Sequence, residues 1–120
     1  FNFFKKLNKY FIVPKISKNI STNFLAYPII LKKNIKFSRK EFQINLEKNY
    51  IQTRPIFSGN ILRHPAFTSI ISKKNSLDSF VNADYIMKYG LLIGCHHGLS
   101  ISNILYIHAI ILKILKIKKL

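Results

Sequence analysis

The sequence is poor in acidic residues, in arginine and in cysteine, and each shortage excludes a kind of protein. Four acidic residues stand against 20 lysines and arginines, which gives a formal charge of +16 at pH 7. The single cysteine, Cys95, cannot form an internal disulfide, so we expect a reducing compartment such as the cytoplasm. Because the chain also lacks a cysteine pair or histidines at ligand spacing, the sequence predicts no metal site.

The positive charge has two explanations. A basic surface can bind nucleic acid or an anionic membrane. However, lysine outnumbers arginine seventeen to three, and lysines are scattered in ones and twos along the chain together with many Ile, Asn, Phe and Tyr residues. This pattern is typical of an AT-rich genome, whereas phosphate recognition favours the forked guanidinium of arginine. We therefore expect neither nucleic acid nor a membrane as partner, and a stand-alone basic binding module is the alternative.

The sequence also lacks a long uninterrupted apolar run. Its most apolar stretch, residues 101–116, is broken by His108 and Lys113 and falls short of the roughly 18 to 20 residues that span a membrane. Residues 1–13 carry lysines inside their apolar pattern and precede no small-residue cleavage site, unlike a secretory signal. The chain starts on Phe1 without a methionine, which is typical of a piece of a longer protein or of a decayed gene.

The residues that are present predict one folded domain. A hydrophobic fraction of 48% and an aromatic fraction of 13% in 120 residues argue against intrinsic disorder. Residues 1–22 are expected to be the end of a helix followed by a linker, and residues 23–120 to be the domain itself.

Apolar patterns predict three strands. Residues 23–31, 51–57 and 91–95 are rich in β-favouring apolar side chains, and the last of these is a continuous run typical of a buried strand. Pro28 places the first strand at a sheet edge or a bulge, because proline has no N–H to donate to a neighbouring strand. A surface loop is expected over 68–80.

Three helices are expected, over residues 39–49, 83–88 and 101–116. Ser38 and Glu41 form a capping-box pattern at the start of the first helix, with Phe42, Leu46 and Tyr50 on its core face and Ile44 at the margin. Ser79 or Asn82 is expected to cap the second helix, and Gly90 to end it.

The last helix begins after Ser100, its expected cap. Helical spacing aligns its apolar positions in one stripe, which comprises residues 101, 104, 105, 108, 111, 112 and 115. We expect this stripe to pack on the sheet and on a further domain.

Functional chemistry is expected in residues 51–67, which hold two of the three arginines. Pro55 pushes Arg54 into an extended conformation, and residues 58–60 (Ser-Gly-Asn) tolerate left-handed backbone angles. A loop of this kind can hold a guanidinium and an amide at fixed positions at the end of a strand.

The same block resembles a known family. Residues 53–60 (Thr-Arg-Pro-Ile-Phe-Ser-Gly-Asn), followed by 63–67 (Arg-His-Pro-Ala-Phe), are similar to the Thr-Arg-Pro-Leu-Phe-Ala-Gly-Asn block in the C-terminal domain of DegT-type sugar aminotransferases and dehydrases. Residues 37–41, 83–87 and 92–99 agree in order and spacing, so the resemblance covers roughly residues 23–115. It is closest to the CDP-4-keto-6-deoxyglucose 3-dehydrase branch of lipopolysaccharide biosynthesis. Family members usually carry acidic residues where Ser102 and Asn103 stand, so a weaker cap is expected there.

The resemblance implies an α+β fold, with a short sheet flanked by helices, equivalent to the small C-terminal domain of a fold-type-I pyridoxal-phosphate enzyme. The parent enzyme would be a homodimer that dehydrates or transaminates a nucleotide-linked keto-deoxysugar. Its large N-terminal domain would hold pyridoxal 5′-phosphate next to a lysine or, in the dehydrases, a histidine. None of these groups can be placed in this sequence. We therefore expect the chain alone to hold no catalytic residue, to bind no cofactor and not to be a competent enzyme.

Five residues are candidates for substrate binding: Arg54, Asn60, Arg63, His96 and His97. A guanidinium can bind a diphosphate through two parallel hydrogen bonds, so Arg54 is the leading candidate. The alternative is that Arg54 bonds carbonyl groups of its own loop. Asn60 is expected to contact the sugar or help close the site, with Arg63 as an electrostatic auxiliary. Since adjacent side chains on an extended segment point to opposite faces, one of the two histidines is expected to face the substrate.

Three further reactive side chains are expected to be structural. These are His64, beside a proline, His108, half-buried on a helix, and Cys95, an inert thiol in an apolar strand.

Overall fold

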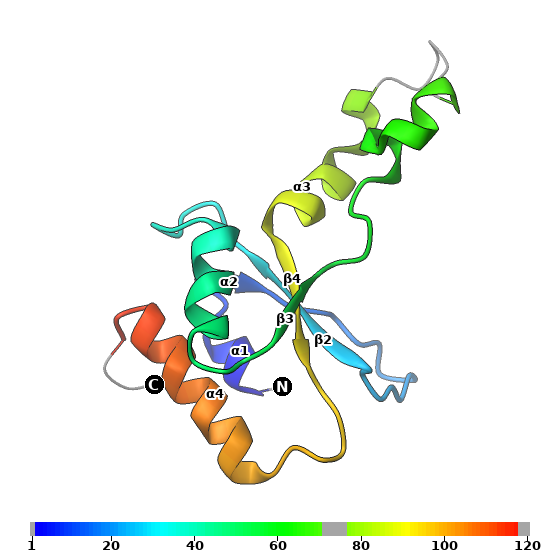
Figure 1. Ribbon diagram of the computed structural model, residues 1–120. Helices are drawn as coiled ribbons and strands as arrows, with labels where there is room; N and C mark the ends of the chain where they lie inside the picture. Colours follow the sequence, from blue (N-terminus) through cyan, green and yellow to red (C-terminus); the bar gives the residue numbers. More distant parts are fainter. Residues whose placement is uncertain (1, 71–76, 118–120) are drawn as a thin grey trace.

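A computed structural model describes residues 2–70 and 77–117, and its centre is a four-stranded sheet (Figure 1). The strands are β1 (Phe11–Ile12), β2 (Ala26–Leu31), β3 (Thr53–Pro55) and β4 (Gly90–Gly94). The α-helices are α1 (Asn2–Lys6), α2 (Arg39–Glu47), α3 (Val81–Tyr89) and α4 (Ile101–Ile114), and the short 3₁₀ helices are η1 (Ile61–Arg63), η2 (Pro65–Ile70) and η3 (Leu77–Phe80). The expected α+β fold with a short sheet flanked by helices is confirmed.

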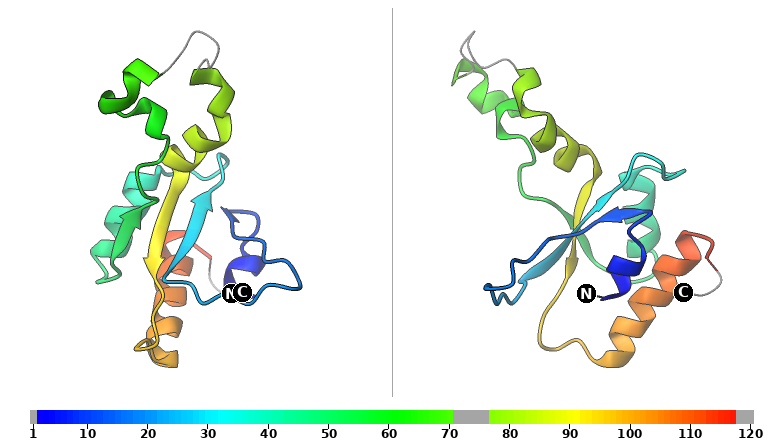
Figure 2. Two further views of the ribbon diagram at one scale, coloured as in Figure 1. Left: turned by 90° about the vertical axis from the view of Figure 1, so that its right-hand side faces the viewer. Right: turned by 180° about the vertical axis from the view of Figure 1, so that it is seen from behind.

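Strand β4 lies in the interior of the sheet, although it comes last in the sequence. The strand order is β1-β2-β4-β3, and each pair of neighbours is antiparallel. Strands β2 and β3 therefore run parallel to each other on either side of β4, and α2 connects them. Helices α1, α2 and α4 lie on one face of the sheet, while α3 and the 3₁₀ helices form an arm that projects beyond it (Figures 1 and 2).

The core forms where this sheet face meets the helices. The register pairs Tyr27 with Ile93 and Ile29 with Leu91, so these four side chains share one face, and each is at most 8% exposed. Helices α1, α2 and α4 cover that face with the buried residues Phe4, Phe42, Leu46, Ile110 and Ile111. Burial of this apolar surface is the main force that holds the domain together.

The segment before residue 23 belongs to the same core. Helix α1 ends at Lys6, and Phe11 and Ile12 pair with Leu31 and Ile30 of β2. Phe4, Leu7 and Phe11 are buried in the main cluster. The expected boundary between the linker and the domain, at residues 22 and 23, stays a prediction.

Pro28 lies where the local pairing tolerates a proline. It is opposite Leu92 of β4, and the pairing with β1 involves only Ile30 and Leu31. Among the described residues, one side of β2 is therefore unpaired at Pro28, as expected for an edge position.

Both expected serine caps are present. Ser38 Oγ accepts the Glu41 N–H at 3.1 Å, and the Glu41 carboxylate accepts the Ser38 N–H at 2.7 Å. At α4, Asn103 completes the same box, because its Oδ1 accepts the Ser100 N–H at 3.0 Å while Ser100 Oγ accepts the Asn103 N–H at 3.2 Å. At α4 an amide oxygen accepts the bond that a carboxylate would accept, and the expectation that this cap is weaker stays a prediction.

Four local expectations differ from what the described residues show. Tyr50 is 96% exposed, because α2 ends at Glu47 and the chain reverses at Tyr50 with a φ of 58°. Strand β3 ends at Pro55 rather than residue 57. Helix α3 begins at Val81, and its N-cap is Phe80, which makes no side-chain capping hydrogen bond, rather than Ser79 or Asn82. Of the expected loop over 68–80, residues 71–76 lie outside the described residues and most of the rest is 3₁₀ helix.

The apolar stripe of α4 divides into two parts. Ile111 is buried, whereas Ile101, Ile104 and Leu105 are 77%, 40% and 60% exposed. The end of the helix therefore packs on the sheet, and its beginning is uncovered within the described part of the chain.

Replacing Leu46 by alanine tests the core. Leu46 is completely buried, whereas Ile44 on the same helix is 40% exposed. Leu46→Ala should lower the free energy of unfolding by about 2–5 kcal/mol, because it removes buried methyl groups and leaves a cavity. Ile44→Ala, the control, should cost less than about 1 kcal/mol. Urea unfolding followed by circular dichroism measures both, and equal losses would contradict the packing described.

Candidate functional site

The five candidate residues lie at two opposite ends of the sheet. Arg54 is the middle residue of β3, and η1 follows with Asn60 as its N-cap and Arg63 as its last residue. His96 and His97 follow the last residue of β4. Because β3 and β4 are antiparallel, the loop after β3 lies at the start of β4, whereas the two histidines lie beyond its end. The structure therefore brings Asn60 and Arg63 together and separates them from the histidines.

Arg54 presents its side chain on the sheet face opposite the helices. It pairs with Leu92, which pairs in turn with Pro28, so these three residues lie on one face. The left view of Figure 2 looks onto the strands from the side away from α1, α2 and α4. The Arg54 side chain is exposed and makes no hydrogen bond or ion pair with the described residues. The alternative in which Arg54 bonds carbonyl groups of its own loop is therefore not observed in the described part of the chain.

The loop after Arg54 contains two residues with left-handed backbone conformations. Phe57 and Gly59 have positive φ angles of 42° and 65°. A Cβ atom at Gly59 would lie 2.4 Å from Cγ of Met87 on α3, so glycine is needed both for its conformation and for the close approach. The left-handed conformation expected in residues 58–60 is confirmed at Gly59.

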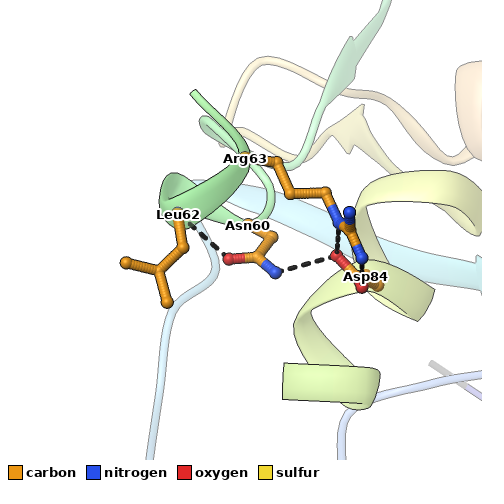
Figure 3. A network of polar contacts seen from close by, with 4 residues as sticks. All are labelled: Asn60, Leu62, Arg63 and Asp84. Carbon is orange, nitrogen blue, oxygen red and sulfur yellow. Dashed lines mark hydrogen bonds and ion pairs between the residues drawn. The ribbon is translucent and has the colours of Figure 1, made fainter. Parts of the chain in front are cut away.

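Asn60 and Arg63 both bind Asp84 of α3 (Figure 3). Asn60 is 3% exposed, and its Nδ2 donates to Asp84 Oδ1 at 2.8 Å while its Oδ1 accepts the Leu62 N–H at 3.1 Å. Arg63 Nε donates to Asp84 Oδ1 at 2.5 Å, and Arg63 Nη2 pairs with Asp84 Oδ2. Both ends of the Asn60 amide are thus bonded within the protein, and two guanidinium nitrogens of Arg63 bind one carboxylate.

This network keeps Asp84 charged. The hydrogen bond from Arg63, followed by that from Asn60, lowers the pKa of Asp84 from 3.8 to about 2. The network connects the loop after β3 to the helix before β4.

Sequence reasoning missed Asp84, although a carboxylate in a chain with four acidic and 20 basic residues is a natural partner for an arginine. A substrate contact by Asn60 or Arg63 stays a prediction.

His96 and His97 line a groove of about 880 Å³, which we call the α4 groove. Its walls are residues 22–25, residues 93–97 and the side of α4 that carries Ile104 and His108. Both His96 and His97 are exposed, and His96 Nδ1 accepts the Gly98 N–H at 3.1 Å. A substrate contact by either histidine stays a prediction.

Two side chains of the groove, the buried Tyr27 and the half-buried His108, have shifted pKa values. Burial lowers the pKa of His108, whose ring stacks on Phe3 with centroids 3.8 Å apart. Burial, followed by the Cys95 thiol, raises the pKa of Tyr27. Both Tyr27 and His108 are therefore uncharged at neutral pH, and His108 is the half-buried residue that was expected.

Pyridoxal phosphate is the cofactor that the resemblance implies for the parent enzyme. That cofactor needs a lysine or histidine at its aldehyde carbon and a carboxylate at its pyridine nitrogen. Glu41 is bonded to Ser38, Glu47 accepts the Thr53 hydroxyl at 2.7 Å, and Asp84 belongs to the network. The described lysines are exposed, apart from the half-buried Lys32.

The described part of the chain contains neither a cluster of metal-ligating side chains nor a membrane-spanning helix. No group of three His, Cys, Asp or Glu side chains there could hold a metal ion. None of the described helices has the length and apolar character needed to cross a membrane.

Two curated proteins are similar to most of this chain. The lipopolysaccharide biosynthesis protein RfbH of Salmonella typhimurium is 28% identical over 95 residues, which cover 79% of this chain and 21% of that protein. The dTDP-4-dehydro-2,6-dideoxy-D-glucose 3-dehydratase of Saccharopolyspora spinosa is 26% identical over 96 residues, which cover 80% of this chain and 20% of that protein. The chain thus spans about a fifth of the length of these relatives.

Solved structures share the fold. The E. coli GDP-4-keto-6-deoxy-D-mannose-3-dehydratase with bound hydrated PLP superposes with a TM-score of 0.73 at 27% identity, over 91% of this chain and 27% of that chain. A GDP-4-keto-6-deoxymannose-3-dehydratase with a trapped PLP-glutamate geminal diamine gives a TM-score of 0.72 at 27% identity, with the same coverage of 91% and 27%. Residues 3–112 match the family whose pattern the sequence resembles, so the chain belongs to the DegT/DnrJ/EryC1/StrS aminotransferase family.

Proposed function

We propose that this chain is the small C-terminal domain of a pyridoxal-phosphate enzyme that dehydrates or transaminates a nucleotide-linked keto-deoxysugar. The observation that carries the proposal is the family match over residues 3–112, together with relatives that are named as sugar 3-dehydratases. Because the chain spans about a fifth of its curated relatives, the activity would belong to a longer polypeptide. That polypeptide would act in lipopolysaccharide synthesis, as a homodimer in the cytoplasm.

Arg54 is the residue that we propose to bind the diphosphate of the substrate. Its backbone is held in a strand paired with β4, and its guanidinium is exposed and without a partner among the described residues. A guanidinium can donate two parallel hydrogen bonds to phosphate oxygens, which a lysine cannot do. Its position on the sheet face away from α1, α2 and α4 supports contact with a ligand or with the rest of the polypeptide.

Asn60 and Arg63 would support this site indirectly. Their polar groups bind Asp84, so they hold the loop that follows Arg54 against α3. Holding this loop in place does not require either side chain to touch the sugar.

The activity itself can be tested on the full-length protein. With pyridoxal phosphate and a nucleotide-linked 4-keto-6-deoxysugar, mass spectrometry should detect either a product that has lost the 3-hydroxyl group or one that has gained an amino group. If neither product forms with any of the common nucleotide carriers, the proposed function is wrong.

Substituting Arg54 tests the site. In the full-length protein, Arg54→Ala should lower kcat/KM about 10-fold to 150-fold, because a hydrogen bond to a charged group contributes roughly 1.5–3 kcal/mol. Arg54→Lys keeps the charge without the fork and should fall between. Arg39→Ala is the matched control, because Arg39 lies on α2, where its side chain bonds Gln43. Steady-state kinetics measure all three variants. An Arg54→Ala enzyme with unchanged kcat and KM would contradict the proposed contact between Arg54 and the substrate.

Asp84→Asn tests the network through its pH dependence. The folded pKa of Asp84, about 2, lies below its usual 3.8, so the ion pair stabilises the fold above about pH 4 and loses this effect as the pH falls towards 2. At pH 7 the variant should unfold at lower urea than the unmodified chain, and the difference should shrink between about pH 4 and 2. A difference that stays constant down to pH 2, or is absent at pH 7, would contradict the network's role.

A further inference from the structure

A second groove, of about 630 Å³, lies along the β1 edge of the sheet, and we call it the β1 groove. Its walls come from the end of α1 and the turn that follows, from β1 with residues 13–16, and from Lys32, the residue after β2. The right view of Figure 2 shows α1 and β1 in blue. The Lys32 N–H donates to the Tyr10 carbonyl at 2.9 Å, which fixes Lys32 beside the start of β1. A groove of this volume is large enough for a small molecule.

The β1 groove is lined by cations and by no acidic residue. Lys5, Lys15 and Lys32 make up a third of its nine lining residues, whereas lysine makes up 17 of the 120 residues of the chain. Lys15 and Lys32 have no ion-pair partner among the described residues. Cations that face one groove without a carboxylate attract a negatively charged ligand.

Lys32 differs from the other described lysines, because it is half-buried and they are exposed. A charged group that is partly removed from water loses solvation free energy unless a counter-charge compensates for it. The described residues provide no such counter-charge for Lys32. A compositional bias towards lysine explains exposed lysines, but it does not explain a cation held partly out of water at the wall of a groove. A bound anion would compensate for the lost solvation.

The other lining residues indicate what the anion carries. Ile12 and Ile16 are 42% and 39% exposed, whereas Phe11 is 2% exposed, so the groove offers aliphatic side chains but no free aromatic face. Nucleotide bases bind proteins mainly by stacking on aromatic rings, so an aliphatic group fits this surface better than a base. A single phosphate carries about −1.5 to −2 at pH 7, which does not balance three lysines, and a diphosphate adds a further charged group.

We propose that the β1 groove binds an alkyl diphosphate. The lysines hold the diphosphate as point charges, and the isoleucines contact the alkyl group. The strand order β1-β2-β4-β3 places this groove and Arg54, on β3, at opposite edges of the sheet. The inference therefore concerns a different surface from the one that is proposed to bind the nucleotide-linked sugar, and it does not rest on the proposed function.

Isothermal titration calorimetry of the 120-residue chain with geranyl diphosphate tests the proposal. We expect saturable binding with a Kd of about 1 mM or tighter. Inorganic pyrophosphate should bind at least about 10-fold more weakly, because it has no methylene groups to bury against the isoleucines. The absence of saturable binding of geranyl diphosphate would overturn the proposal, and so would pyrophosphate that binds as tightly.

Three variants locate the binding site. Lys32→Gln should weaken the binding of geranyl diphosphate about 10-fold, whereas Lys32→Arg keeps the charge and should stay within about 3-fold of the unmodified chain. Lys88→Gln is the control, because it removes the same charge from α3, in the arm. Equal losses in Lys32→Gln and Lys88→Gln would show attraction to the net charge alone and would overturn the proposal. If circular dichroism shows that Lys32→Gln is unfolded, Lys15→Gln, at an exposed position, replaces it and should also weaken binding.

Two further titrations separate this site from other sources of diphosphate. Cytidine diphosphate should bind no more tightly than pyrophosphate, and tighter binding of cytidine diphosphate than of geranyl diphosphate would assign the groove to a nucleotide and overturn the proposal. Arg54→Ala should leave the Kd of geranyl diphosphate unchanged, and a loss of binding in this variant would place the ligand at Arg54 instead. Binding in the groove without turnover by the full-length protein would contradict only the proposed function, and turnover without such binding would contradict only this inference.

Discussion

The pairing of β4 with both β2 and β3 is the constraint on which the rest of the structure depends. This register sends Leu91 and Ile93 into the core and places Leu92 and Arg54 on the opposite face. Because side chains alternate along a strand, a slip by one residue would expose the core residues and bury the guanidinium. The backbone hydrogen bonds between these strands therefore determine both which residues form the hydrophobic core and where Arg54, the residue proposed to bind phosphate, lies.

The Asn60–Arg63–Asp84 network secures this arrangement at one end of the sheet. It joins the loop that leaves β3 to the helix that enters β4, so the two strands are connected through side chains as well as through their backbones. Gly59 permits the close approach to Met87 that this contact requires. The α4 groove lies at the other end of β4. There the first residues of α4 extend beyond the core that the rest of the helix covers. One end of the sheet is thus closed by charged contacts, and the other presents an uncharged surface.

Signals that are local in the sequence predicted much of this structure. The Ser38–Glu41 capping box, the buried strand near 91–95 and the glycine turn were all readable, because each depends on a few neighbouring residues. The exposure of Tyr50, the divided stripe of α4 and the role of Asp84 were not readable. Each depends on which distant element covers a surface, and periodicity alone cannot specify that. The Thr-Arg-Pro block indicated the family, but the partners of Asn60 and Arg63 required the fold.

We propose that this domain presents Arg54 to a nucleotide-linked sugar within a longer pyridoxal-phosphate enzyme. The most direct measurement is a crystal structure of the full-length protein with a nucleotide-linked keto-deoxysugar. We expect the Arg54 guanidinium to lie within about 3 Å of a diphosphate oxygen, with Asn60 and Arg63 still bound to Asp84. A diphosphate bound entirely by other residues, with Arg54 facing solvent, would contradict it.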